Sequence, residues 1–165
     1  MLTAQRRGDL SGMLWSEIDF AKHRWSIPGR RTKNKRSHIV HLSDPVMTEL
    51  KTLRAAADPE CDLVFTTTGK TPVNGFSRVK HRLDQIVQLP DWRFHDLRTA
   101  FASSLCDAGE PEGVVDRVLN HAASGSAPSA VARVYNQSEY LPQRARALDM
   151  WANLVVGNGA TAALP

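Results

Sequence analysis

Apolar positions recur along this chain with helical spacing more often than with the alternation of strands. Apolar residues three or four positions apart lie on one helix face, and such patterns predict two short helices and five longer ones. The segments are residues 7–14, 43–57, 75–87, 94–108, 111–120, 129–135 and 141–156. Ser43 and Pro45 are typical of a helix start, and Gly109 before Pro111 is typical of a helix end.

Three short segments between the helices, residues 24–28, 37–42 and 63–65, are predicted as β-strands. The first ends at Pro28-Gly29, so the basic residues 29–36 are expected to form a hairpin loop. The predicted fold class is α+β, mainly α-helical with a small three-stranded antiparallel sheet. We expect one domain over residues 1–156 and a flexible tail over residues 157–165, which are small and polar.

Length and composition are those of a soluble globular protein. The 165 residues suffice for about one domain, and a net charge of +4 favours an anionic partner. Cys61 and Cys106 lie far apart in no metal or redox motif, which is typical of a reducing compartment. No segment approaches the roughly 20 apolar residues of a membrane span, and the N-terminus lacks a signal-peptide core. We therefore expect a cytoplasmic protein.

Six polar residues, in a fixed order along the chain, form the candidate catalytic set. They are Arg6, Lys33, His95, Arg98, His121 and Tyr135. Arginine and lysine neutralise phosphate charge, histidine exchanges hydrogen bonds and protons, and tyrosine supplies a nucleophile. This inventory suits attack on a DNA phosphodiester without a metal ion. The order of the set is more informative than any one member.

Arg6 and Arg98 are the candidate phosphate clamp. Guanidinium groups bind phosphate oxygens bidentately and keep their charge, so two of them can neutralise a pentavalent transition state. His95 and Arg98 form a His-x-x-Arg box, whose spacing places both side chains on one helix face. Spacing alone does not separate Arg6 from the adjacent Arg7, and an arginine at a frayed N-terminus is the alternative interpretation.

The predicted hairpin loop is the most basic stretch of the chain. Five of the eight residues 29–36 are lysine or arginine, which suits phosphate contacts or insertion into a DNA groove. Lys33 is the candidate that protonates the leaving 5′ oxygen, although composition does not separate it from Lys35. The cations predicted to bind DNA are Arg30, Arg31, Lys35 and Arg36. A solvated basic turn is the alternative interpretation of this loop.

His121 and Tyr135 complete the candidate set. His121 follows a predicted core helix and is expected to hydrogen-bond a non-bridging phosphate oxygen; a histidine that caps the helix end is the alternative. Tyr135, one of two tyrosines, is the candidate nucleophile, and its attack would leave a 3′-phosphotyrosine. A phenol with a pKa of about 10 needs nearby cations and a base to lose its proton. Tyr140 is predicted to anchor the start of the next helix.

Other catalytic chemistries lack their motifs in this sequence. The chain has no Gly-x-x-x-x-Gly-Lys-Ser/Thr phosphate loop and no Cys/His spacing typical of zinc. Its acidic residues are scattered, whereas a metal nuclease requires them in a cluster. We therefore expect neither a metal nor another cofactor.

Together these segments resemble the catalytic domain of the tyrosine recombinases, the phage-integrase family. The resemblance covers residues 3–10, 135–141 and 147–152 and the boxes between them. It implies an integrase-type DNA breaking-rejoining fold and site-specific recombination of double-stranded DNA through a 3′-phosphotyrosine. By this resemblance the family's functional residues fall at Arg6, Lys33, His95, Arg98, His121 and Tyr135.

Four positions depart from the family pattern. Ala4 stands where a glycine usually precedes the first arginine, and Asn120 replaces the glycine before His121. Asp9 replaces a glutamate that braces the active site, and His41 replaces a proline in the second strand. Family members also carry a DNA-encircling helical domain before this region. That domain and the first catalytic helix are expected to be absent here, which predicts weaker DNA binding.

The last predicted helix suggests a protein partner. Its apolar residues are Leu141, Leu148, Trp151, Leu154 and Val155. This face is expected to pack on its own domain, yet C-terminal segments of the family dock on neighbouring protomers, which implies a homo-oligomer on DNA. Two alternatives share the same residues: a type IB topoisomerase-like nicking-closing enzyme, and an inactive prophage remnant that binds DNA without turnover. The Arg-Arg-Gly-Asp and Tyr-Asn-x-x-x-Tyr contexts favour the recombinase.

Overall fold

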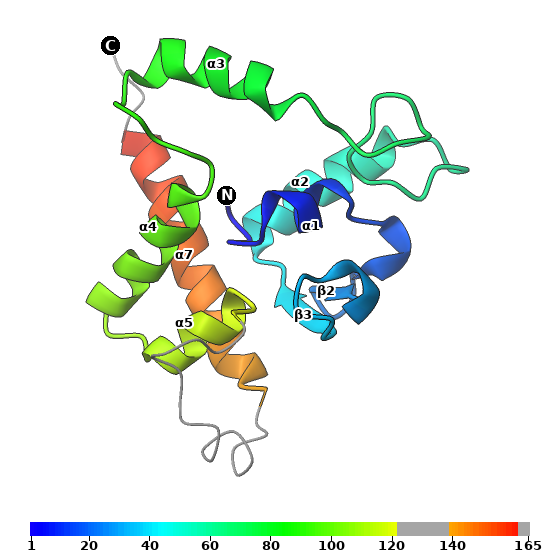
Figure 1. The fold of residues 1–165 in the computed structure, drawn as a ribbon. Helices are drawn as coiled ribbons and strands as arrows, with labels where there is room; N and C mark the ends of the chain where they lie inside the picture. The colour runs from blue at the N-terminus through cyan, green and yellow to red at the C-terminus, as the bar shows by residue number, and fades with distance from the viewer. Residues whose placement is uncertain (122–138, 162–165) are drawn as a thin grey trace.

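The computed structural model describes residues 1–121 and 139–161 and shows helices around a small sheet (Figure 1). The helices are α1 (Arg7–Ser11), α2 (Asp44–Ala55), α3 (Phe76–Val87), α4 (Asp96–Asp107), α5 (Glu112–Val118) and α7 (Leu141–Thr161), and the strands are β1 (Ile18–Asp19), β2 (Arg24–Ile27) and β3 (His38–His41). Short 3-10 turns lie at Trp15–Glu17 and Gly29–Arg31. The predicted fold class is confirmed, while the helix predicted at residues 129–135 lies outside the described residues.

The sheet is an antiparallel meander in the order β1-β2-β3. β2 buries Trp25 and Ile27 and exposes the residues between them, the alternation expected of a strand with one solvent face. The prediction of a third strand at residues 63–65 is wrong, because this segment contributes only an isolated bridge from Leu63 to Leu14. β1 takes the edge position instead, since a strand next to β2 in sequence closes a shorter loop than residues 63–65 would.

α4, α5 and α7 form the helical half of the core. α7 lies against α4, α5, α2 and β3, and it passes behind α4 and α5 in Figure 1. Phe101 of α4 meets Trp151 of α7 edge to face, with ring centroids 5.6 Å apart. The apolar face of α7 therefore packs on its own domain, as predicted.

α7 is longer than its sequence pattern predicted. It extends to Thr161, beyond the predicted end at Val156, so the first residues of the predicted flexible tail are helical. Among the described helices, none combines the length and the apolarity that a membrane crossing requires. Cys61 and Cys106 are both free thiols.

α3 stands apart from the rest of the molecule, at the top of Figure 1. Its bounds agree with the prediction, but none of its residues is buried, and Ile86 is 77% exposed. Helices in proteins are stabilised mainly by packing an apolar face. α3 receives little of that support from the described part of this chain.

Candidate active site

The predicted clamp arginines meet at the C-terminal end of α5. Arg98 donates from Nη2 to the Leu119 carbonyl at 2.7 Å, and Arg6 donates from Nη2 to the Asn120 carbonyl at 3.2 Å. Gln5 donates to the Val118 carbonyl at 2.9 Å. The last carbonyls of a helix have no partner within the helix, and the helix dipole makes this end negative. We call the carbonyls of residues 118–120 and the side chains that bind them the α5 junction.

Arg98 is the more deeply buried arginine of the α5 junction, with 6% of its surface exposed. Its Nη1 donates to the Ala4 carbonyl at 2.5 Å, so the guanidinium joins the N-terminal segment to α5. Burial, helped by the charge of Arg6, lowers the pKa of Arg98 to about 10, and the group stays cationic at neutral pH. Its Nε is buried without a hydrogen-bond partner among the described residues, and an added acceptor would stabilise such a donor.

Arg6 and Arg7 point in different directions. Nη1 of Arg6 lies 3.8 Å from the Asp9 carboxylate. Burial raises the pKa of Asp9, and the charge of Arg6 opposes that rise. Arg7 is exposed, and its guanidinium lies 4.8 Å from the ring centre of Phe76. The geometry thus places Arg6, and not Arg7, beside Arg98.

Both predicted histidines are exposed next to the α5 junction. His95 occupies the N-cap position of α4 and lines a cleft together with Arg6 and Arg98. The helix begins one residue later, so only the arginine of the His-x-x-Arg box lies within it. The His121 side chain is 45% exposed, and its Nδ1 lies 3.1 Å from the Asp116 carboxylate. Both imidazole rings are accessible to a ligand that approaches from solvent.

The cations of the hairpin loop lie in two kinds of surroundings. Exposed cations are Arg30, Lys33, Lys35 and Arg36. Arg31 instead forms an ion pair with the Glu17 carboxylate and donates from Nη2 to the Asp9 carbonyl at 2.9 Å. Arg31 therefore braces the base of the loop against α1, and its guanidinium already has two acceptors within the protein.

Tyr135, the predicted nucleophile, lies outside the described residues. The chain is described again from Glu139. Tyr140 packs half-buried against the core, and the Arg117 guanidinium lies 4.5 Å from its ring centre. This placement agrees with the interpretation of Tyr140 as the anchor of α7, and the choice of Tyr135 stays a prediction.

Sequence reasoning does not single out His38 and Arg144, which tie the α5 junction to β3 and α7. The His38 Nε2 donates to the Val118 carbonyl at 3.1 Å, and its Nδ1 accepts from Arg144 Nη2 at 3.3 Å. The ring is neutral, because burial, helped by the charge of Arg144, lowers the pKa of His38 to about 3. The strand alternation could have found this residue, since His38 shares the buried face of β3 with Val40.

A cleft of about 1130 Å³ opens beside the two clamp arginines. Its lining includes Arg6, His95 and Arg98 together with apolar side chains of α3 and of residues 89–94, among them Leu83 and Trp92. Within the described ranges, no three His, Cys, Asp or Glu side chains gather as a metal site requires.

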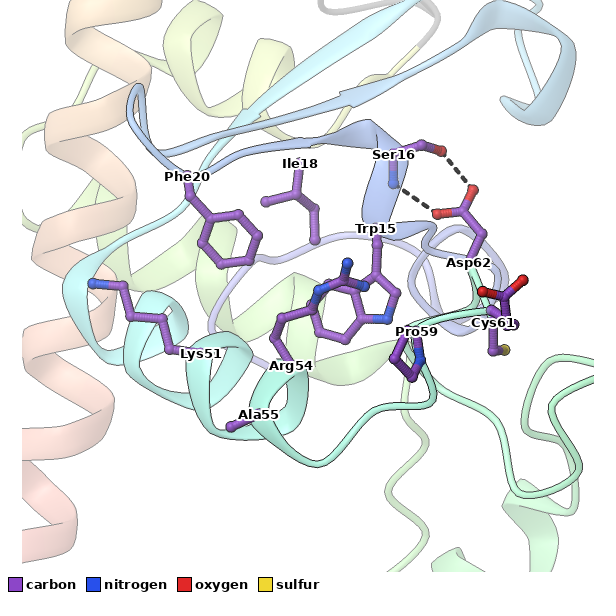
Figure 2. A pocket seen from close by; sticks show the side chains of 11 residues that line it. Trp15, Ser16, Ile18, Phe20, Lys51, Arg54, Ala55, Pro59, Cys61 and Asp62 are labelled. Atoms are coloured by element: carbon purple, nitrogen blue, oxygen red, sulfur yellow. Dashed lines mark hydrogen bonds between the residues drawn. The ribbon is translucent and has the colours of Figure 1, made fainter.

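A second hollow lies between the Trp15–Glu17 turn, Phe20 and α2 (Figure 2). The Arg54 guanidinium covers the Trp15 ring, 5.0 Å from its centre. The Ser16 backbone N–H and hydroxyl donate to the Asp62 carboxylate at 2.8 and 2.6 Å and close one edge. Among the residues that the structure describes, none of the predicted catalytic set lines this hollow.

The sequence and fold of this chain are similar to those of known integrases and recombinases. The chain belongs to the phage integrase family, since the sequence model of that family matches residues 1–140. It is 31% identical over 157 residues to prophage integrase IntA of Escherichia coli K12, covering 94% of this chain and 37% of IntA. It is 28% identical over 153 residues to the integrase of Shigella phage Sf6, covering 92% and 38%. The chain therefore spans less than two fifths of the length of these relatives.

Two solved structures share the fold. The XerA recombinase superposes with a TM-score of 0.57 at 20% identity, over 87% of this chain and 53% of that chain. The Tn1549 transposon integrase in complex with circular intermediate DNA superposes with a TM-score of 0.54 at 14% identity, over 81% and 53%. This likeness confirms the predicted integrase-type fold.

Proposed function

We propose that this chain is the catalytic part of a site-specific DNA recombinase, which cleaves and rejoins double-stranded DNA through a 3′-phosphotyrosine. The observation that carries the proposal is the α5 junction, where Arg6 and Arg98 bind adjacent carbonyls beside the exposed His95 and His121. Two arginines that line the same cleft can bind the non-bridging oxygens of one phosphate. The relatives that match most of this chain are prophage and phage integrases, which favours recombination over nicking and closing alone.

In the proposed reaction, the phenolate oxygen of Tyr135 attacks phosphorus. A bond from this oxygen to phosphorus forms, the bond from phosphorus to the 5′ oxygen breaks, and the Lys33 ammonium transfers a proton to the leaving oxygen. Arg6 and Arg98 neutralise the pentavalent transition state, and His121 adds a hydrogen bond to a non-bridging oxygen. Attack of a 5′ hydroxyl on the phosphotyrosine reverses the step and rejoins the strand.

Exposed residues of the hairpin loop and of α7 suggest how the protein binds DNA and how it assembles. The exposed Arg30, Lys35 and Arg36 are proposed to contact DNA phosphates, whereas Arg31 is proposed to support the loop. The far end of α7 exposes apolar surface, with Leu154 39% and Val156 47% exposed. We propose that this end meets a neighbouring protomer on DNA. A recombinase of this kind would act in the cytoplasm, where the target DNA lies.

The proposal is tested with a DNA duplex that carries a candidate attachment site and a nick or a 5′-bridging phosphorothiolate. The leaving strand of such a substrate cannot religate, so the covalent adduct accumulates and is read on a denaturing gel and by peptide mapping. We expect an adduct on Tyr135 that disappears in Tyr135→Phe and persists in the control Tyr140→Phe. An adduct that persists in Tyr135→Phe would overturn the nucleophile. Salt-dependent DNA binding without any adduct would favour the inactive remnant.

A further inference from the structure

Asn120, two residues after the end of α5, lies in the left-handed region of backbone space, with a φ of 49°. Glycine reaches this region without steric cost, and asparagine is among the few other residues that visit it routinely. Glycine would satisfy the backbone at this position equally well. The side chain of Asn120 therefore needs an explanation other than the conformation of its own backbone.

The side chain of Asn120 contacts the hairpin loop of residues 29–36. Oδ1 of Asn120 accepts a hydrogen bond from Nδ2 of Asn34 at 2.7 Å, across 86 residues of sequence. The backbone carbonyl of Asn120 accepts from Arg6. Asn34 lies between Lys33 and Lys35. Asn120 therefore connects the clamp arginine, through its backbone, with the candidate proton donor of the loop, through its side chain.

The loop itself is held together by internal hydrogen bonds. The Thr32 hydroxyl donates to the Arg36 carbonyl at 2.7 Å, and Oδ1 of Asn34 accepts from the Arg36 backbone N–H at 3.2 Å. Arg31 anchors the base of the loop to Glu17. Because the loop is closed on itself, a hydrogen bond at its tip fixes the position of the whole tip relative to the α5 junction.

We propose that the Asn34–Asn120 hydrogen bond is a latch that holds Lys33 over the phosphate bound by Arg6 and Arg98. This inference rests on the proposed function and deepens it. Asn34 and Asn120 are positioning residues that act through the Lys33 ammonium, which protonates the leaving 5′ oxygen as the bond from that oxygen to phosphorus breaks. The latch pre-orders a proton donor that otherwise samples solvent at the tip of a hairpin.

Three substitutions test the latch. Asn120→Gly removes the acceptor of the hydrogen bond, and glycine adopts a φ of 49° without steric cost. Ala4→Gly is the matched control, since Ala4 also has a positive φ, 52°, lies two residues before Arg6 and has no polar side-chain group. Asn120→Asp keeps an acceptor for Asn34 Nδ2 and serves as the conservative rescue.

The first experiment measures docking of the loop without DNA. Trypsin cleavage after Lys33 and Lys35, mapped by mass spectrometry, tracks the population of undocked loop. We expect Asn120→Gly to be cleaved there about three- to tenfold faster than the unmodified chain, the factor that one net hydrogen bond provides. Ala4→Gly and Asn120→Asp should be cleaved at the unmodified rate. Equal rates in Asn120→Gly and the unmodified chain would overturn the latch.

The second experiment measures the chemistry with two matched duplexes, one with a 5′ oxygen and one with a 5′ sulfur at the scissile bond. A thiolate leaves without protonation, so only the oxygen substrate depends on the Lys33 proton. We expect Asn120→Gly to form adduct about three- to tenfold more slowly on the oxygen substrate and at the unmodified rate on the sulfur substrate. Equal slowing on both substrates would mean a merely structural role and would overturn the proposal. Absence of adduct in the unmodified chain on both substrates would instead refute the proposed function, and trypsin cleavage would still decide whether the loop is docked.

Discussion

The α5 junction and α3 differ strongly in how many buried tertiary contacts hold them in place. At the α5 junction, Val118 and Leu119 are buried, and their carbonyls accept hydrogen bonds from side chains of the N-terminal segment, α4 and β3. α3 has no buried residue. The residues proposed to hold a phosphate are therefore fixed by contacts that are distant in sequence, whereas α3 depends on contacts that are local or exposed.

The contacts of α3 show how weak that local support is. Lys80 forms a partly buried ion pair with Asp84 one turn away and lies 4.2 Å from the Trp92 ring centre. Ion pairs of this spacing contribute about 0.3–0.5 kcal/mol, and exposed cation–π contacts about 0.5–1 kcal/mol. Segments with few buried contacts open without unfolding of the rest. We infer that α3 opens locally while the α5 junction unfolds only with the whole domain.

The largest expected effect is that of removing the guanidinium of Arg98. Arg98→Ala leaves the carbonyls of Ala4 and Leu119 buried without donors. At about 1–3 kcal/mol for each unsatisfied group, the free energy of unfolding should fall by roughly 2–6 kcal/mol. Urea denaturation measures this change. The matched control is Arg7→Ala, which removes an exposed cation–π contact on the α3 side and should cost less than about 1 kcal/mol. If both variants lost the same free energy of unfolding, the α5 junction would not be better supported than the α3 side.

The second prediction concerns acid sensitivity of the α5 junction. Burial lowers the pKa of His38 from its ordinary 6.5 to about 3, so between these values the unfolded chain binds a proton that the folded chain does not. The stability contributed by neutral His38 is therefore present above pH 6.5 and is lost as pH falls towards 3, by up to roughly 1.4 kcal/mol per pH unit. Urea denaturation at pH 7, 6, 5 and 4 measures the slope.

His38→Gln is the control for that slope. A glutamine amide can donate to the Val118 carbonyl and accept from Arg144, as the neutral imidazole does, but it does not titrate. Its stability should depend less on pH than that of the unmodified chain across this window. If the two slopes are the same, His38 is not the group that makes the α5 junction acid-sensitive.

The comparison also explains which parts of the fold the sequence predicts. The helices are local patterns, so most of their bounds agree with the apolar spacing, α3 included. β2 and β3 are local as well, since Pro28-Gly29 marks their hairpin. β1 is two residues long, too short to show an alternation, and its place at the sheet edge depends on pairing with β2. Patterns therefore predict elements, but they do not predict which elements receive tertiary support.

The candidate site also has features that the sequence predicts and features that depend on the tertiary fold. The order of Arg6, His95, Arg98 and His121 is visible in the sequence. In the structure Arg6 and Arg98 bind the carbonyls that follow α5, and His95 lines the same cleft as these two arginines. Spacing does not separate Arg6 from Arg7, because their directions depend on tertiary contacts, those of Arg6 with Asn120 and those of Arg7 with Phe76. The contacts of His38 with Arg144, and of Asn34 with Asn120, join residues 106 and 86 positions apart. Pairings at such separations follow from the tertiary fold and leave no periodic trace in the sequence.

The third prediction concerns a substitution that should stabilise α3 and leave the other helices unchanged. Gln88, the C-cap of α3, has a φ of 45° and is exposed. A side chain in this region costs about 1–2 kcal/mol, partly offset by the greater freedom that glycine loses on folding. Gln88→Gly should therefore stabilise α3 by about 0.5–1 kcal/mol. Hydrogen exchange should slow by a few-fold for α3 amides and stay unchanged for amides of α4 and α5. Slowing in all three helices would mean that α3 opens only together with the domain.

The smallest expected effect separates exposed apolar surface from packed surface. Ile86 of α3 is 77% exposed, so Ile86→Ala removes little packing and replaces a β-branched residue by a better helix former. The free energy of unfolding should change by less than about 0.5 kcal/mol. Leu105→Ala in α4 is the matched control, because Leu105 is fully buried and its truncation should cost about 2–5 kcal/mol. Both values come from urea denaturation midpoints at an unchanged slope. A loss for Ile86→Ala as large as that for Leu105→Ala would show that α3 is packed in solution, and the local opening inferred for α3 would then be wrong.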